Sequence, residues 1–263
     1  MRKSKVLAKI RSGEVARLCA MGSFLPYFPR LANAAGFDGI WVDGEHKPFT
    51  ARETQALIAF HHLADIDCLW RPPTREKNGL YRILEDGATG LIISHVGSAA
   101  EAQAIVDAAK FPPLGDRGLD GAGFDAEFGK NGGASYPADA NRETALFVQV
   151  ETPQALAQVE AIAAVAGVDG IFLGPGDLSL RLGCKPDATD PVMADVHRQL
   201  AVACSRHAKV WGRPVANQTD LDLVLAAGAG FVVFGGEFRM IQNALADCGK
   251  ALDRALEKRA ATG

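Results

Sequence analysis

Short apolar runs recur along the chain, and segments with helical periodicity separate most of them. The eight runs span residues 17–24, 37–43, 67–71, 90–96, 146–151, 168–173, 210–217 and 231–235. Their length and their content of Val, Ile, Leu and Phe are typical of buried strands. Strands that alternate with helices favour parallel βαβ units, and eight such units close into a (β/α)8 barrel. The pattern therefore predicts an α/β protein with a single TIM barrel.

Helical periodicity predicts the segments between these runs. We expect helices over residues 30–35, 51–63, 80–86 and 154–166, and from 238 to about 258. Gly36 and Gly167 each follow such a segment, and the next apolar run begins immediately afterwards. Glycine is the preferred residue just beyond a helix end, so both positions indicate short helix-to-strand turns. The 263 residues are close to the usual length of one barrel, and we expect residues 1–263 to form one catalytic domain.

One segment, residues 111–142, does not follow this alternation of strands and helices. It has seven glycines between Gly115 and Gly133 and no sustained periodicity. Long irregular segments in compact domains are usually lids, partner contacts or disordered regions. Because this one should enter the fifth strand from the side of the barrel away from the strand ends, a subunit contact is at least as well supported as a lid.

Composition and charge exclude several classes of protein. Apolar residues make up 48% of the chain and the formal net charge is −3, which gives no reason to expect a nucleic acid or an anionic membrane as partner. No stretch approaches the roughly 20 apolar residues that a membrane span needs. The five cysteines are scattered, without a Cys-x-x-Cys motif, and are expected to be reduced thiols. We therefore expect a soluble, cytoplasmic protein.

Polar residues stand at the carboxyl ends of the apolar runs, where barrel enzymes place their active sites. They include Asp43, Glu45, His46, Arg71, Ser94, His95, Gln149, Glu151, Asp177 and Asn217. A carboxylate next to an imidazole is the arrangement of a general acid–base pair, which favours a catalytic role for Asp43 and His46 over a structural turn. Arg71 carries a permanent positive charge, which suits the oxygen of a developing enolate or of a carboxylate. The alternative interpretation is that Arg71 only forms a salt bridge with a nearby acid.

The other histidines are less informative. For His95, a second acid–base group and a satisfied core histidine are equally open. The remaining four, His61, His62, His197 and His207, fall in or near helical segments and are expected at the surface.

Glu151 and Asp177 are the candidate metal ligands. Each follows an apolar run, and the two runs are joined by a helical segment, so their strands should be parallel neighbours with converging ends. Two carboxylates at that point would suit a hard divalent cation. The alternative is a surface Glu151 and an Asp177 that caps a helix. No lysine stands at a strand end, which favours a metal over a Schiff base as the electron sink.

Several motifs occur together in a fixed order between residues 36 and 236. They are Gly36-Phe37-Asp38, Asp43-Gly44-Glu45-His46, Arg71-Pro72, Phe111-Pro112-Pro113 with Arg117-Gly118, Gln149-Val150-Glu151-Thr152, Val168-Asp169-Gly170-Ile171-Phe172, Gly174-Pro175-Gly176-Asp177-Leu178-Ser179 and Ala216-Asn217. In this combination the chain resembles the HpcH/HpaI aldolases. These are metal-dependent class II pyruvate aldolases with a barrel of the phosphoenolpyruvate/pyruvate-binding type, related to 4-hydroxy-2-oxoheptanedioate and 2-dehydro-3-deoxyglucarate aldolases.

The resemblance implies a role for each site residue. Glu151 and Asp177 would hold Mg²⁺, Mn²⁺ or Co²⁺ with Gln149 beside it, and the backbone amides of Gly176 and Asp177 would receive the pyruvate carboxylate. Arg71 would stabilise the enolate oxygen, and Asp43 with His46 would handle protons. It also implies a hexamer built as a trimer of dimers.

Three departures from the family concern the aldehyde half of the substrate. Cys19-Ala20 replaces a common Trp, and Ser94-His95 follows Ile93 where relatives often have Val-Pro. Pro214 stands where relatives place a bulky apolar residue, and we expect it to line the substrate pocket.

The expected reaction is reversible cleavage of a 4-hydroxy-2-oxo acid to an aldehyde and pyruvate, or a related 2-oxo acid such as hydroxypyruvate. The alternatives are a metal-dependent lyase of acyl-CoA thioesters, of the citryl- or malyl-CoA type, and an isomerase or synthase of phosphorylated metabolites that uses Gly235-Gly236 as a phosphate cradle. A barrel that only binds a metabolite is the alternative outside enzymes, and it has no need of Asp43, His46 and Arg71.

Overall fold

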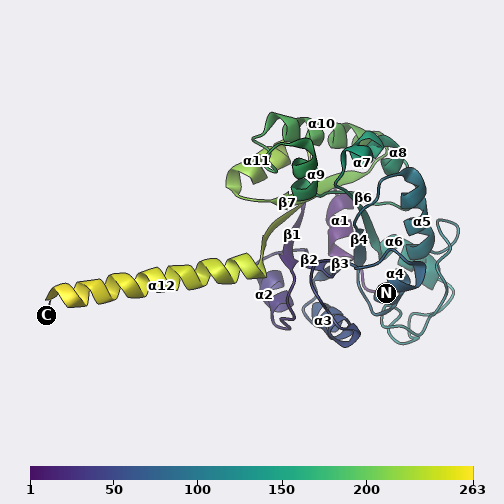
Figure 1. The fold of residues 1–263 in the computed structure, drawn as a ribbon. Coiled ribbons are helices and arrows are strands. Elements are labelled where there is room, and N and C mark those ends of the chain that lie inside the picture. The colour runs from purple at the N-terminus through teal and green to yellow at the C-terminus, as the bar shows by residue number, and fades with distance from the viewer. Residues whose placement is uncertain (263) are drawn as a thin grey trace.

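Eight parallel strands close into a barrel in the computed structural model, which describes residues 1–262 (Figure 1). In order around the barrel they are β1 (Ala16–Met21), β2 (Gly39–Asp43), β3 (Asp67–Arg71), β4 (Gly90–Ile93), β5 (Ala145–Val150), β6 (Gly170–Leu173), β7 (Val210–Val215) and β8 (Phe231–Gly236). β8 pairs with β1 and completes the ring. The predicted TIM barrel is confirmed.

Helices precede β1, connect the strands and follow β8. They are α1 (Lys5–Arg11), α2 (Phe28–Ala34), α3 (Ala51–Leu63), α4 (Lys77–Glu85), α5 (Ala99–Ala109), α6 (Tyr136–Glu143), α7 (Pro153–Ala157), α8 (Val159–Ala163), α9 (Pro175–Leu182), α10 (Pro191–Arg206), α11 (Gln218–Ala226) and α12 (Glu237–Thr262). The predicted single helix over 154–166 is divided into α7 and α8, because Gln158 leaves the helical conformation between them (φ −101°, ψ 4°).

Apolar side chains fill both faces of the barrel wall. One apolar cluster contains Leu18, Leu69, Phe147, Phe172 and Phe231. The rings of Phe147 and Phe231 in it are 4.7 Å apart. A larger cluster lies between the strands and the helices around them. Because both faces are covered, all residues of β3 to β6 are buried. Within β3 to β6 the charged residues are Asp67 and Arg71, at the two ends of β3.

The glycine-rich segment 111–142 consists mainly of turns, with α6 at its end. A buried cluster organises it: Arg117 and the Tyr136 hydroxyl both donate to Asp125, at 3.0 and 2.6 Å. The Arg117 guanidinium also lies 4.7 Å from the centre of the Phe111 ring. The segment is therefore irregular in secondary structure but held by specific contacts.

Two of the histidines expected at the surface are buried. His61 has no exposed surface and His197 is 2% exposed. Burial lowers the pKa of each to about 4. The expectation was wrong for both: His61 Nδ1 contacts the Leu57 carbonyl one turn earlier in α3, and the His197 ring stacks on Trp211 of β7.

The last helix, α12, extends away from the barrel (Figure 1). Its exposed apolar side chains include Phe238, Ile241, Leu245, Leu252 and Leu256, which recur at the helical period and so share one face. No helix within residues 1–262 has the length and apolar content that a membrane crossing requires.

Candidate active site

A closed ring of polar side chains lies at the carboxyl ends of β2 to β5. Arg71 contacts Glu45 at 3.1 Å, Glu45 contacts His95 at 3.0 Å, and His95 contacts Glu151 at 2.8 Å. Gln149 Nε2 donates to Glu151 at 2.5 Å, and Gln149 Oε1 lies 3.5 Å from Arg71. Four consecutive strands therefore bring together residues that are far apart in the sequence.

Arg71 is the central cation of this ring and is 5% exposed. Its Nη2 lies 2.8 Å from Asp43 Oδ1 and its Nη1 lies 3.1 Å from Glu45 Oε2. The guanidinium also stacks over Trp41, with Cζ 4.7 Å from the ring centre. Contacts on several sides fix its position, which is the condition for a preorganised positive charge.

Asp43 and His46 do not form the expected carboxylate–imidazole contact. Asp43 Oδ1 accepts instead from the backbone N–H groups of Glu45 and His46, both at 3.1 Å, because the chain turns back at Gly44. The His46 side chain is 65% exposed, and the nearest acid to its ring is Glu45, with Nε2 3.7 Å from Oε2. Glu45 is therefore the acid that faces the ring of His46, and Asp43 shapes the turn and holds Arg71.

Glu151 is almost fully buried, at 2% exposure. Its Oε1 accepts from both the backbone N–H and the ring Nδ1 of His95, and its Oε2 accepts from Gln149. A Cβ at Gly174 would lie 2.8 Å from both Gln149 Nε2 and Glu151 Cβ, and 3.1 Å from Glu151 Oε2. The glycine therefore lets the chain at the start of α9 pass close to the Glu151 carboxylate.

Asp177 lies in that first turn, with its side chain 48% exposed. Its Oδ1 accepts from Arg181 at 3.0 Å, and the same Arg181 nitrogen lies 3.4 Å from the Glu151 backbone oxygen. Different donors therefore hold the two carboxylates: Arg181 for Asp177, and His95 with Gln149 for Glu151. Within residues 1–262, no group of three or more His, Cys, Asp or Glu side chains is gathered in an arrangement that could hold a metal. The convergence of Glu151 and Asp177 on one cation stays a prediction.

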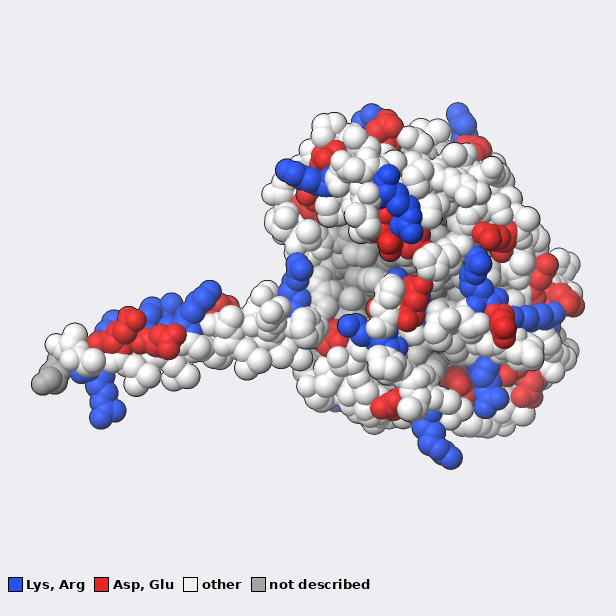
Figure 2. Space-filling view, in the orientation of Figure 1, with Lys and Arg blue, Asp and Glu red and all other residues white. Residues whose placement is uncertain are grey.

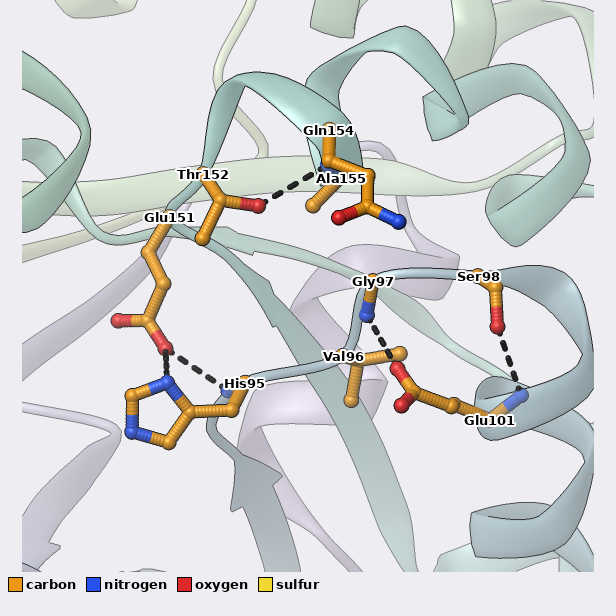
Figure 3. A pocket seen from close by; sticks show the side chains of 9 residues that line it. All are labelled: His95, Val96, Gly97, Ser98, Glu101, Glu151, Thr152, Gln154 and Ala155. Atoms are coloured by element: carbon orange, nitrogen blue, oxygen red, sulfur yellow. Dashed lines mark hydrogen bonds and ion pairs between the residues drawn. The ribbon is translucent and has the colours of Figure 1, made fainter. Parts of the chain in front are cut away.

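A chamber of about 440 Å³ opens beside the ring, between β1, β2 and β6 to β8. Its walls include Trp41, Gly176, Pro214, Val233 and Arg239. Figure 2 shows the barrel hollowed at its centre, with acidic and basic side chains around the hollow. A second pocket of about 220 Å³ lies between the loops after β4 and β5, and His95 and Glu151 are on its wall (Figure 3).

Comparison with known proteins identifies the relatives of this chain. Residues 21–244 match the model of the family described as HpcH/HpaI aldolase/citrate lyase. The chain belongs to this family. The 2-keto-3-deoxy-L-rhamnonate aldolase of Klebsiella pneumoniae is 33% identical over 231 residues, which cover 86% of this chain and 84% of the relative. The hydroxypyruvate/pyruvate aldolase of Pseudomonas aeruginosa is 33% identical over 241 residues, with 90% and 88% covered.

A solved structure supports the same assignment. The HpcH/HpaI aldolase of Desulfitobacterium hafniense superposes with a TM-score of 0.85 at 27% identity, covering 93% of this chain and 95% of that one. The resemblance found in the sequence is confirmed, and so is the expectation that this member of the HpcH/HpaI family is an aldolase.

The structure adds residues that the sequence left open or missed. Glu45 and His95, whose roles were undecided, both belong to the ring. Trp41 was missed, although strand alternation places it on the same face as Asp43. Arg181 was missed because it lies in a helix, one turn after Asp177, where a salt bridge at the (i, i+4) spacing gives no sign of a site.

Proposed function

We propose that the protein is a divalent-metal-dependent aldolase that reversibly cleaves a 4-hydroxy-2-oxo acid to an aldehyde and pyruvate, or a related 2-oxo acid such as hydroxypyruvate. The observation that carries this proposal is the buried Arg71, which Asp43 and Glu45 hold. Gln149 links it to the Glu151 carboxylate, and its guanidinium stacks on Trp41 of the chamber wall. Curated relatives that match most of the chain are aldolases by name.

The residues at the ends of β5 and β6 fit a hard cation. Glu151 and Asp177 supply two carboxylates, and Mg²⁺ commonly completes its ligand set with water and substrate oxygens. Gly174 brings the start of α9, with Asp177 in its first turn, close to Glu151 Oε2, because any larger residue there would meet the Gln149 and Glu151 side chains. We propose Mg²⁺, Mn²⁺ or Co²⁺ as the ion. When bound, the cation would supply a Lewis acid for the negative charge that develops on the keto oxygen.

The protein's own groups divide the remaining work. Arg71 places a fixed positive charge where the enolate oxygen forms, and Trp41 and Asp43 hold it in place. His46 accepts the proton of the C4 hydroxyl, directly or through one water, and the carboxylate of Glu45 stabilises the protonated ring.

The start of α9 would bind the substrate carboxylate. The first N–H groups of a helix have no partner within it, and the helix dipole favours an anion there. Gly176 and Asp177 are in this first turn, and Gly176 is on the chamber wall. Gln149 and Pro214 would complete the substrate contacts, Gln149 beside Arg71 and Pro214 along the aldehyde half.

The proposal is tested by measuring pyruvate release from a panel of 4-hydroxy-2-oxo acids with Mg²⁺, Mn²⁺ or Co²⁺. We expect release from at least one compound, loss of nearly all activity after chelation, and recovery when the ion is restored. The panel should include acyl-CoA thioesters as the competing substrate class. Undiminished cleavage in excess chelator, or activity on thioesters alone, would contradict the proposal.

We also propose that the protein is a homo-oligomer, a hexamer built as a trimer of dimers, that works in the cytoplasm. The apolar face of α12 supports assembly: Leu245 is 67% exposed and Leu252 is 66% exposed. Figure 2 shows uncharged side chains along much of this helix. An amphipathic helix gains most of its stability by packing its apolar face against other parts of a protein. We therefore expect this face of α12 to pack against another subunit. The five cysteines are free thiols, the state that a reducing compartment maintains.

A charge on this face should break the assembly. The double substitution Leu245→Asp and Leu252→Asp is expected to lower the particle mass measured by light scattering after size exclusion, because aspartate is costly to bury unpaired. Lys250→Glu, on the opposite face of α12, is the matched control and should leave the mass unchanged. A double variant with the mass of the wild type would exclude this face as an interface.

A further inference from the structure

His95 holds the candidate metal ligand Glu151 from outside the chamber. Its backbone N–H and its ring Nδ1 both lie 2.8 Å from Glu151 Oε1. Its ring Nε2 lies 3.0 Å from Glu45 Oε1. One side chain therefore joins the loop after β2 to the end of β5, and Figure 3 shows the ring and the backbone of His95 facing the same carboxylate oxygen.

The backbone of His95 is unusual for this purpose. Its φ of 58° lies in the left-handed region, which non-glycine residues seldom adopt. A residue keeps such a conformation where the surrounding structure demands it, and these positions cluster at functional sites. Here the conformation turns the N–H of His95 toward Glu151, so that the N–H and the ring reach one oxygen together.

The consequence concerns the two oxygens of Glu151. Oε1 is taken by two donors from His95, whereas Oε2 accepts from Gln149 and lies close to Gly174 at the start of α9. A carboxylate tethered at one oxygen presents the other in a fixed direction. The partners that orient metal ligands in this way typically change metal affinity by about 10–100-fold when they are replaced.

We propose that His95 is a positioning residue for the metal site: it tethers Glu151 Oε1 so that Oε2 is presented toward Gly174 and the first turn of α9. This inference rests on the proposed function, because it requires that Glu151 bind the ion. The ring is 57% exposed in the side pocket, so its role is distinct from that of a packed core histidine.

The test is Mn²⁺ binding, followed by the electron paramagnetic resonance signal of the free ion, in the absence of substrate. His95→Gly is the main variant, since glycine adopts the left-handed backbone freely and so isolates the loss of the ring. We expect its Kd for Mn²⁺ to rise by about tenfold or more. His95→Asn, whose amide N–H donor takes nearly the position of the ring Nδ1, should recover part of the affinity.

Ser94→Ala is the matched control. Ser94 Oγ donates to Glu45 Oε1 at 2.8 Å, so its loss perturbs the same neighbourhood while both contacts from His95 to Glu151 remain. We expect wild-type Mn²⁺ affinity for this variant, and a melting temperature close to that of the wild type for all three.

The outcomes separate this inference from the proposed function. Wild-type protein that binds Mn²⁺ with the same Kd as His95→Gly would overturn the role of His95 and leave the aldolase proposal standing. A Ser94→Ala variant weakened as much as His95→Gly would also overturn it, since the effect would then come through Glu45. Wild-type protein that binds no Mn²⁺ would defeat the proposed function and this inference with it.

Discussion

Replacing Arg71 by Lys is expected to lower kcat for pyruvate release by about 10²–10³-fold, the effect of removing one fixed donor from a developing oxyanion. Lysine keeps the charge but has no planar fork. It cannot reach Asp43, Glu45 and Gln149 together as Arg71 does, nor stack as a flat group on Trp41. The measurement is steady-state pyruvate release with saturating Mn²⁺.

The control for Arg71 separates lost chemistry from lost structure. Because Arg71 is buried between acids, its replacement also removes ion-pair contacts, so the melting temperature and Mn²⁺ affinity should be measured on the same preparation. A folded variant that binds Mn²⁺ and still turns over at more than a tenth of the wild-type rate would show that Arg71 has only a structural role.

The barrel was predictable because its signal is carried by whole segments. A strand covered on both faces must be apolar throughout, and such runs stand out against the amphipathic helices between them. β3 was predicted to the residue, Asp67–Arg71, because Pro72 and Pro73 end it in the sequence. Other ends were predicted too long: β4 stops at Ile93, and His95 beyond it leaves the extended conformation.

The identity of the site residues followed from their position, but their contacts did not. A polar residue at a barrel strand end is informative because the wall below it is apolar. Which acid faces which base depends on the turn after the strand, and the turn at Gly44 pairs the ring of His46 with Glu45 instead of Asp43. Strand periodicity does not describe such turns, so the contacts of Glu45 could not be predicted from it.

The buried histidines show a second limit. His61 and His62 are adjacent in α3, yet only His61 is fully buried. A helical segment of modest amphipathicity does not reveal which of two neighbouring positions faces the barrel wall. The physical reason is that a neutral imidazole can be buried at moderate cost when one nitrogen has a partner, and the Leu57 carbonyl provides it.

Replacing Glu151 by Gln is expected to abolish both Mn²⁺ binding and turnover, with kcat lowered by about 10³-fold or more, since metal-ion stabilisation of the transition state is worth several kcal/mol. The two side chains have nearly the same shape, so packing around this buried position should be preserved. The amide removes the negative charge and replaces one acceptor oxygen with an N–H donor. In the wild type, His95 and Gln149 both donate to the carboxylate, so the new donor would face one of them. Calorimetric titration with Mn²⁺ and the pyruvate assay measure the two effects.

Glu101→Gln is the matched control for this charge. Glu101 lies on the same side pocket, and its Oε2 accepts from the Gly97 N–H at 2.6 Å, but its side chain is 44% exposed and lies in α5, away from the ring (Figure 3). The two variants lose the same charge from neighbouring positions, so a general electrostatic effect would appear in both. Loss confined to Glu151→Gln would assign the cation to the end of β5. Turnover by Glu151→Gln at the wild-type rate, with Mn²⁺ still bound, would place the ion elsewhere and remove the role proposed for Glu151.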